Sequence, residues 1–126
     1  MDLHLANKVF IVTGGAKGIG AAISRVIALE AGIVVIAGRD KNDNHQTVDE
    51  IVKLHGRAAS HTVELADADA CKELIDFAIT KFGRLDGLVN NAGVNDGVGL
   101  ENGSPEKFMQ SLQKNLSHYY NLAHYG

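Results

Sequence analysis

The stretch KVFIVTGGAKGIG, residues 8–20, decides the fold. Its first part, Lys8 to Thr13, is mostly apolar and β-branched and ends at a glycine pair, which is typical of a buried parallel strand. Beyond Gly18, apolar residues recur at the i, i+3, i+4, i+7 spacing of one helix face. A strand that turns through glycines directly into an amphipathic helix predicts the first unit of an α/β sheet.

The same alternation continues along the chain. Further strands are predicted at residues 33–37, 58–65 and 87–90, and glycines 32, 56 and 83 stand where the intervening helices would end. Ser104 and Pro105 have the N-cap and N1 residue types of a last helix that continues through residue 123. The pattern predicts the α/β class, a doubly wound parallel sheet of Rossmann-like type, and only the N-terminal half of the usual set of about six strands.

Composition narrows the functional classes. The chain has 126 residues, 45% hydrophobic and 21% charged, which is enough for one globular domain. A formal charge of -3 and the lack of a Lys/Arg cluster argue against nucleic acid as a partner. No apolar run approaches the roughly 18 residues of a membrane span, and the N-terminus does not look like a secretion signal. We therefore expect a cytoplasmic protein without a membrane partner.

Cysteine and histidine give no sign of redox or metal chemistry. The single cysteine, Cys71, falls in a helical stretch and is expected to be a packing residue. The six histidines have no spacing that would place two ligands and a third together, so we expect them to be solvated surface residues and predict no metal site.

The glycines after the first predicted strand suit an anion. Gly14, Gly18 and Gly20 form a GxxxGxG pattern at the start of a helix, where free N–H groups and the helix dipole favour a phosphate. Side chains at positions 18 and 20 would block its close approach. An ordinary turn is the alternative interpretation.

Two further motifs accompany the glycine loop. NNAG occupies residues 90–93 at the end of the fourth predicted strand, and KNL occupies residues 114–116 in the last helix. With these three motifs in this order, the sequence resembles the short-chain dehydrogenase/reductase family over essentially its whole length. The resemblance implies an NAD(P)-dependent oxidoreductase that transfers a hydride between nicotinamide and an alcohol or carbonyl. Residues 1–126 would be its NAD(P)-binding Rossmann-like domain, truncated in the helix after the fourth strand.

The resemblance also implies which residues form the site. The implied cofactor-binding residues are Gly14, Ala16, Lys17, Gly18, Ile19, Gly20, Arg39, Glu64, Leu65, Asn90, Ala92 and Gly93. Glu64 departs from the aspartate that the family usually carries there. Asn115 is implied to hold a water in the catalytic proton relay, and a structural amide is the alternative.

The end of the second strand bears on the choice of cofactor. NAD-binding folds usually place an acidic residue there to hold the ribose, but this chain has Gly38. The adjacent Arg39, together with Lys17, could bind the 2′-phosphate of NADP. NADP is therefore favoured, and the alternative is NAD with Asp40 on its ribose.

The family's catalytic serine and YxxxK motif are not found in these residues. Tyr119 and Tyr120 are followed at the fourth place by Ala123 and His124, and Tyr125 stands next to the last residue. We expect the parent protein to be an enzyme and the 126-residue chain itself to be inactive. The alternative is a non-catalytic nucleotide-binding fragment or module.

Substrate and assembly are also suggested by the resemblance. The loop at residues 93–101 is similar to that of family members of the L-fucose dehydrogenase type, so an aldose sugar is one candidate substrate among small-molecule alcohols. In relatives the last helix packs against a neighbouring subunit. Tyr119 and Tyr120 are accordingly candidate interface residues of a homo-oligomer, a dimer or a tetramer.

Overall fold

A four-stranded parallel sheet organises the chain. The computed structural model describes residues 3–65, 67–92, 103–113 and 117–126. Its strands are β1 (Val9–Thr13), β2 (Ile33–Gly38), β3 (Arg57–Thr62) and β4 (Gly87–Val89), in the order β3-β2-β1-β4. Helices α1 (Gly18–Leu29), α2 (Lys41–Lys53) and α3 (Ala68–Phe82) connect them. After β4 come α4 (Pro105–Leu112) and α5 (His118–Tyr125).

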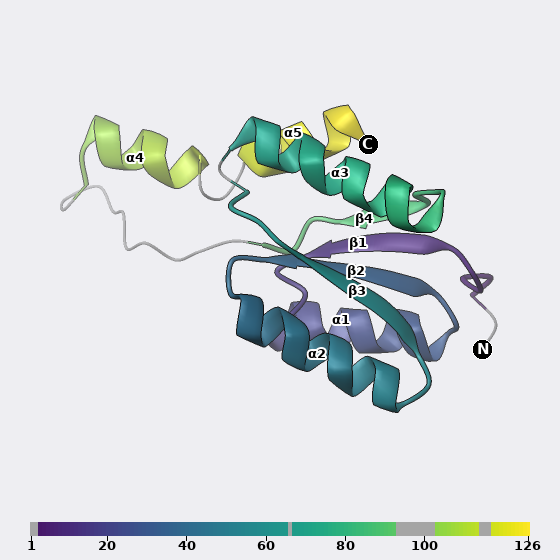
Figure 1. The fold of residues 1–126 in the computed structure, drawn as a ribbon. Helices are drawn as coiled ribbons and strands as arrows, with labels where there is room; N and C mark the ends of the chain where they lie inside the picture. Colours follow the sequence, from purple (N-terminus) through teal and green to yellow (C-terminus); the bar gives the residue numbers. More distant parts are fainter. Residues whose placement is uncertain (1–2, 66, 93–102, 114–116) are drawn as a thin grey trace.

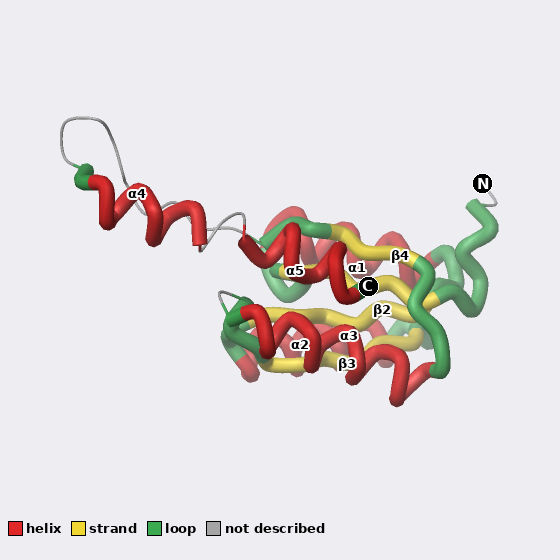
Figure 2. The backbone as a smooth tube through the Cα atoms, turned by 90° about the horizontal axis from the view of Figure 1, so that it is seen from above, coloured by secondary structure: helices red, strands yellow, loops and turns green. Residues whose placement is uncertain are grey.

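Helices cover both faces of the sheet (Figures 1 and 2). On one face Val12, Val34 and Ile36 pack with residues of α1 and α2, while on the other Ile11 and Val35 pack with residues of α3 and α5. Successive residues of a strand point to opposite faces, so a strand buried on both sides must be apolar throughout. The doubly wound parallel sheet predicted from the sequence is therefore present.

Helix ends differ from the prediction in one respect. The backbone turns left-handed at Ala31, with φ 66°, one residue before the glycine that was expected to end α1. A Cβ on Gly32 would lie 2.6 Å from the Ile27 methyl Cγ2, so this glycine is needed for close approach and not for its conformational freedom. The pair His55–Gly56 repeats the arrangement at the end of α2.

Side chains cap the starts of α3 and α4, and the cap at Ser104 was predicted from the sequence. The carboxylate of Asp67 accepts a hydrogen bond from Asp69 N at 2.9 Å, and the hydroxyl of Ser104 accepts one from Lys107 N at 3.2 Å. Of the last helix expected over residues 105–123, the structure describes α4 and α5, and residues 114–116 between them lie outside the described part of the chain. None of the helices described is long and apolar enough to cross a membrane.

Candidate functional site

A cavity of about 680 Å³ opens where the carboxyl ends of the strands meet. Crevices at this edge are where open α/β sheets bind ligands, because the crossovers to either side diverge there. The walls come from the loop after β1, the end of β2 with the start of α2, the segment after β3, the segment after β4, and α5. The lining residues are Gly14, Ala16, Lys17, Ala37, Gly38, Arg39, Asp40, Asp43, Asn44, Val63, Glu64, Leu65, Asn91, Ala92 and His118.

Side chains from two helices hold the glycine loop in shape. The hydroxyl of Ser24 donates to the carbonyl of Gly15 or Gly20, at 3.2 and 2.9 Å, and the hydroxyl of Thr47 donates to the carbonyl of Ala16 at 3.0 Å. A Cβ on Gly20 would overlap the carbonyl oxygen of the loop's first glycine. Gly20 is thus required by the packing of the loop itself.

Gly18, in contrast, is not required by close packing. Its φ is 54°, and a Cβ built there would have no neighbour within 4 Å. The residue before it, Lys17, is the N-cap of α1 and makes no side-chain capping bond, whereas α2, α3 and α4 are each capped by a side chain. The first turn of α1 therefore has no capping side chain in the described structure, and the Cβ position of Gly18 faces open space. Both features suit an anion site.

Thr13 fastens the end of β4 to the glycine loop. Its hydroxyl oxygen accepts hydrogen bonds from Asn91 N and Ala92 N, both at 3.0 Å, and the hydroxyl donates to the carbonyl of Val89 at 3.3 Å. The amide of Asn91 also donates to the carbonyl of Gly14 at 3.3 Å. Sequence reasoning missed Thr13 as a site residue, although a threonine directly before the glycine pair was a usable signal.

At the end of β2 an amide fills the place of a side chain. Asn44 is 1% exposed and donates from Nδ2 to the carbonyl of Gly38 at 3.1 Å. A Cβ on Gly38 would lie 2.8 Å from Oδ1 of Asn44. Position 38 therefore has no room for an acidic side chain while Asn44 keeps this place.

Asp40 is committed to the start of α2. One oxygen of its carboxylate accepts hydrogen bonds from Asn42 N at 2.9 Å and Asp43 N at 3.0 Å. The bond from Asp43 N is the main reason that the pKa of Asp40 lies below its usual value. A ribose hydroxyl at this carboxylate would have to share it with the cap.

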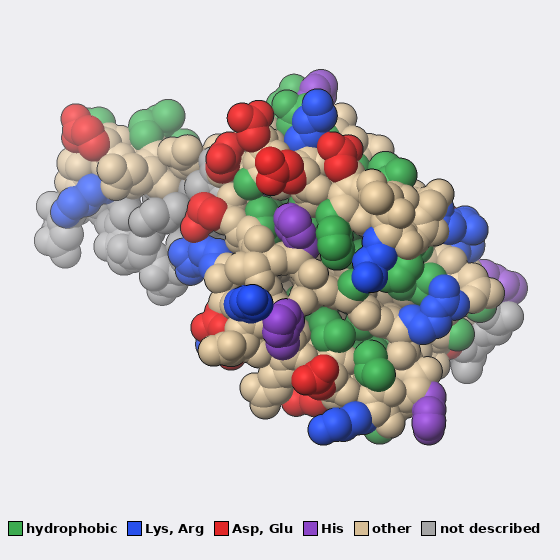
Figure 3. All heavy atoms as spheres, viewed as in Figure 1, with side chains coloured by type: hydrophobic (Ala, Val, Ile, Leu, Met, Phe, Trp, Pro, Cys, Tyr) green, Lys and Arg blue, Asp and Glu red, His purple; other side chains and the backbone are tan. Residues whose placement is uncertain are grey.

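Both basic residues expected at a 2′-phosphate lie at the cavity beside carboxylates. Nζ of Lys17 is 2.9 Å from Oδ2 of Asp43, and Nη1 of Arg39 is 4.0 Å from Oε2 of Glu64. The hydrogen bond to Asp43 raises the pKa of Lys17. On the face shown in Figure 3, Lys and Arg side chains lie scattered among acidic ones and form no continuous basic surface.

The cavity brings together most of the residues expected to bind the cofactor. Those that line it are Gly14, Ala16, Lys17, Arg39, Glu64, Leu65 and Ala92. Gly18, Gly20 and Asn90 are not among its lining residues, and the side chain of Ile19 is 74% exposed. Gly93, Asn115 and the loop at residues 94–101 lie outside the described residues.

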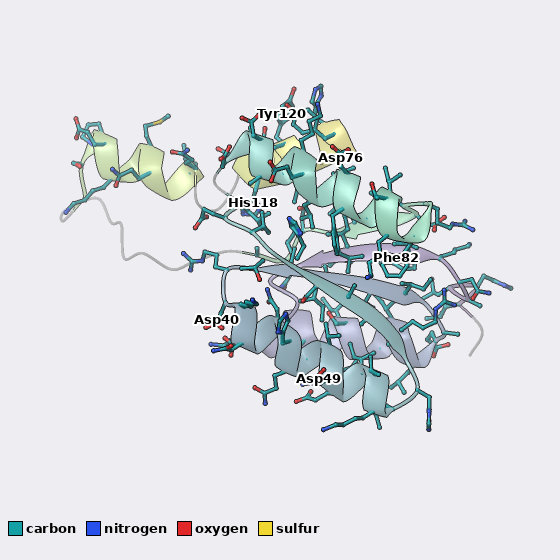
Figure 4. The ribbon with its side chains drawn as sticks, in the orientation of Figure 1. Asp40, Asp49, Asp76, Phe82, His118 and Tyr120 are labelled. Carbon is teal, nitrogen blue, oxygen red and sulfur yellow. The ribbon has the colours of Figure 1, made fainter. Side chains whose placement is uncertain are left out.

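His118 corrects the expectation of a solvated histidine. It is 1% exposed, lines the cavity from α5 and lies between that helix and the sheet (Figure 4). It stands four residues before Leu122, which is completely buried, so helical spacing would have placed it on the inner face. Tyr120 faces outward, with 70% of it exposed. Cys71 is buried as expected, and no cluster of metal-ligating side chains occurs in the part of the chain that is described.

Known proteins resemble this chain in sequence over nearly its whole length. A 3-oxoacyl-[acyl-carrier-protein] reductase from Thermotoga maritima is 31% identical over 120 residues, covering 95% of this chain and 49% of that protein. A cyclohexanol dehydrogenase from an Acinetobacter species is 32% identical over 126 residues, covering 99% and 50%. The chain thus spans about half the length of these curated relatives.

Solved structures agree with the sequence comparisons. The crystal structure of a metagenomic short-chain oxidoreductase in complex with NADP superposes with a TM-score of 0.89 at 35% identity, covering 96% of this chain and 55% of that one. The profile of the short chain dehydrogenase family matches residues 8–125. Profile, relatives and fold together show that the chain belongs to the short-chain dehydrogenase family, whose members here are oxidoreductases.

Proposed function

We propose that this chain is the dinucleotide-binding part of an NAD(P)-dependent oxidoreductase acting on an alcohol or carbonyl. The observation that carries the proposal is the uncapped N-terminus of α1 beside Gly18, at the edge of the sheet where the 680 Å³ cavity opens. Such a helix start suits a pyrophosphate, and such a cavity suits the nucleoside halves on either side. When bound, the nicotinamide would supply or accept the hydride.

The described residues suggest how a dinucleotide would be held. N–H groups of the glycine loop and of the first turn of α1 would bind the pyrophosphate. Leu65 and its backbone, after β3, would border the adenine. Ala92, whose N–H donates to the Thr13 hydroxyl, would border the nicotinamide ribose. The family resemblance adds Asn90 and Gly93 to this group, and Gly93 lies outside the described residues. The hydroxyl of Thr13 would keep the segment after β4 at a constant distance from the glycine loop.

NADP is the cofactor that we favour. Arg39 and Lys17 both line the cavity where the adenosine ribose would lie, and position 38 has no acidic side chain to repel a phosphate. The capping bonds of Asp40 make it a poor holder of the NAD ribose. NAD remains the alternative cofactor, because the carboxylates of Asp43 and Glu64 in the same cavity would repel a 2′-phosphate, which NAD lacks.

For the substrate we propose an alcohol or carbonyl compound, with an aldose sugar such as L-fucose as one candidate beside other alcohols, ketones and acyl-carrier substrates. The support for a sugar is the similarity of the loop at residues 93–101 to family members that oxidise such sugars, and its polar residues could bond sugar hydroxyls. Oxidation of L-fucose by the natural gene product, with cyclohexanol as the comparison substrate, tests this candidate. A preference for cyclohexanol would overturn it.

Residues 1–126 by themselves are proposed to bind the cofactor without catalysis. None of the tyrosines in them is followed four places on by lysine, so these residues do not supply the family's proton-transfer pair. Asn115 would contribute one member of the proton relay. A non-catalytic nucleotide-binding module is the second candidate function, and turnover by the natural gene product would exclude it.

Assembly and location are proposed on the family's pattern. We propose a homo-oligomer, a dimer or a tetramer, in the cytoplasm, with the exposed Tyr120 at a subunit contact. Sedimentation of the natural gene product tests the assembly. A Tyr120→Glu variant should dissociate, and an unchanged sedimentation coefficient would argue against this contact.

The cofactor proposal has a matched pair of variants. Gly18 and Gly83 both have positive φ and open space at the Cβ position. Gly18 directly follows Lys17, which lines the cavity, whereas Gly83 ends α3 and neither of its neighbours lines the cavity. Gly18→Glu puts a carboxylate at the proposed pyrophosphate site and should abolish binding of NADP and NAD in calorimetric titration. Gly83→Glu likewise places a side chain at positive φ, here 78°, and should bind as wild type. Equal affinity in both variants would refute the site.

A further inference from the structure

The proposed 2′-phosphate site already contains its own anions. Lys17 pairs with Asp43 at 2.9 Å, and Arg39 lies 4.0 Å from Glu64. All four residues line the same cavity. A 2′-phosphate entering this site would therefore meet basic groups that already have carboxylates beside them.

Asp43 is the more firmly placed partner of its ion pair. Its backbone N–H donates to the carboxylate of Asp40 at 3.0 Å, and the next residue, Asn44, is buried and bonded to Gly38. The exposed fraction of its side chain is 26%, against 77% for Lys17. The helix start that bears Asp43 is thus held by capping and by packing, whereas Lys17 is the long and largely exposed partner.

This pairing affects the two cofactors differently. A 2′-phosphate carries between one and two negative charges, so it must compete with the Asp43 carboxylate for Lys17 while being repelled by that carboxylate. NAD has a hydroxyl at the same place, so it neither needs Lys17 nor feels this repulsion. Removing the Asp43 charge should consequently change the affinity for one cofactor and not for the other.

We propose that Asp43 is a specificity-determining residue, which holds Lys17 and lowers the affinity of the site for a 2′-phosphorylated dinucleotide, so that both NADP and NAD are accepted. The inference rests on the proposed cofactor function. It assigns to Asp43 a role that neither the glycine loop nor the end of β2 reveals, because the residue comes from the first turn of the following helix.

The direct test is Asp43→Asn, which keeps the shape of the side chain and removes its charge. Dissociation constants of NADP and NAD are measured by calorimetry on the natural gene product without substrate. NADP should bind roughly three- to tenfold more tightly, the size of one screened charge–charge interaction at close range, while NAD should change less than about twofold. Asp49→Asn is the matched control, since it removes the same charge from an exposed position of α2 outside the cavity lining (Figure 4).

A second background separates competition for Lys17 from simple repulsion. In Lys17→Met the Asp43→Asn replacement should improve NADP binding much less than in wild type, because no lysine is left to release. An equal gain in both backgrounds, or an equal gain from Asp49→Asn, overturns the proposed role. If wild type binds both dinucleotides and Asp43→Asn changes neither affinity, the inference fails alone; if wild type binds neither, the cofactor proposal fails with it.

Discussion

Replacing Gly20 by alanine should damage the glycine loop, whereas the same replacement at Gly18 should leave it intact. A Cβ on Gly20 would overlap the carbonyl oxygen of Gly14 and lie 2.6 Å from Nδ2 of Asn91. Neither neighbour can retreat freely, because Gly14 N donates to the carbonyl of Ala37 at 2.8 Å and the Asn91 amide bonds Gly14. At Gly18 the added methyl group meets nothing within 4 Å.

The two variants are expected to lose different amounts of folding stability. Forcing a methyl group into a packed place costs about 1–3 kcal/mol, and losing the Asn91–Gly14 hydrogen bond adds about 1 kcal/mol, so Gly20→Ala should lose about 2–4 kcal/mol of stability. Gly18→Ala has only the strain of alanine at φ 54°, about 1 kcal/mol. A difference of about 2 kcal/mol corresponds to about 4–8 °C in Tm for a protein of this family's size.

Calorimetric melting of the natural gene product, without cofactor, measures this difference. Gly18→Ala should melt near wild type yet bind dinucleotide more weakly, because its methyl group stands beside the proposed pyrophosphate site. Gly20→Ala should lose both stability and binding. Equal melting temperatures for the two variants would refute the reasoning from loop packing.

Three further predictions concern Thr13, Asp86 and Cys71. Thr13→Val removes an oxygen that accepts hydrogen bonds from two backbone N–H groups, and it should cost about 2–3 kcal/mol of stability, measured by chemical denaturation. Thr13→Ser keeps the hydroxyl and should retain most of the stability. Equal losses in the two variants would argue against a role for the hydroxyl. The hydrogen bond from Arg84 is the main cause that lowers the pKa of Asp86. The stabilisation that the Asp86 carboxylate gives the folded protein should therefore be complete at neutral pH. It should be lost as the pH falls below about 4 and through the lowered pKa of Asp86. Asp86→Asn should flatten this part of the pH profile of unfolding. Burial raises the pKa of the Cys71 thiol, so it should react with an aromatic disulfide reagent only after unfolding, and rapid reaction of the native protein would contradict its burial.

Local sequence patterns were enough for the sheet. The run at residues 33–37 is buried and the run at residues 8–13 is mostly buried, so their apolar character reflects the packed environment, and glycines mark the turns after them. The third strand was predicted to extend through residue 65 but ends at Thr62, because its neighbour β2 ends at Gly38 and offers no further partner. Where a strand ends depends on how far the adjacent strand extends, and the sequence of one strand alone does not show this.

Contacts between elements could not be read from the sequence. The pairing of Lys17 with Asp43 depends on how the start of α2 is oriented against the glycine loop, and that orientation is set by Thr47 and by the buried Asn44. His118 was missed for a different reason, since the residue type suggested solvent while its helical spacing from Leu122 indicated burial. Spacing was the better guide at this position.

The hydrogen bonds of Thr13 also bear on the order of folding. They join residues 78 and 79 positions apart in the chain, whereas β1 and β2 pair across a single short crossover. Forming contacts so distant in sequence requires the long loop between them to close, which costs more entropy than local pairing. During synthesis the glycine loop would leave the ribosome before the NNAG segment, so the contacts between them could form only after that segment had been made. A ligand that bridges the two segments would then act on the last step of assembly, drawing the folding equilibrium toward the native state in proportion to its concentration.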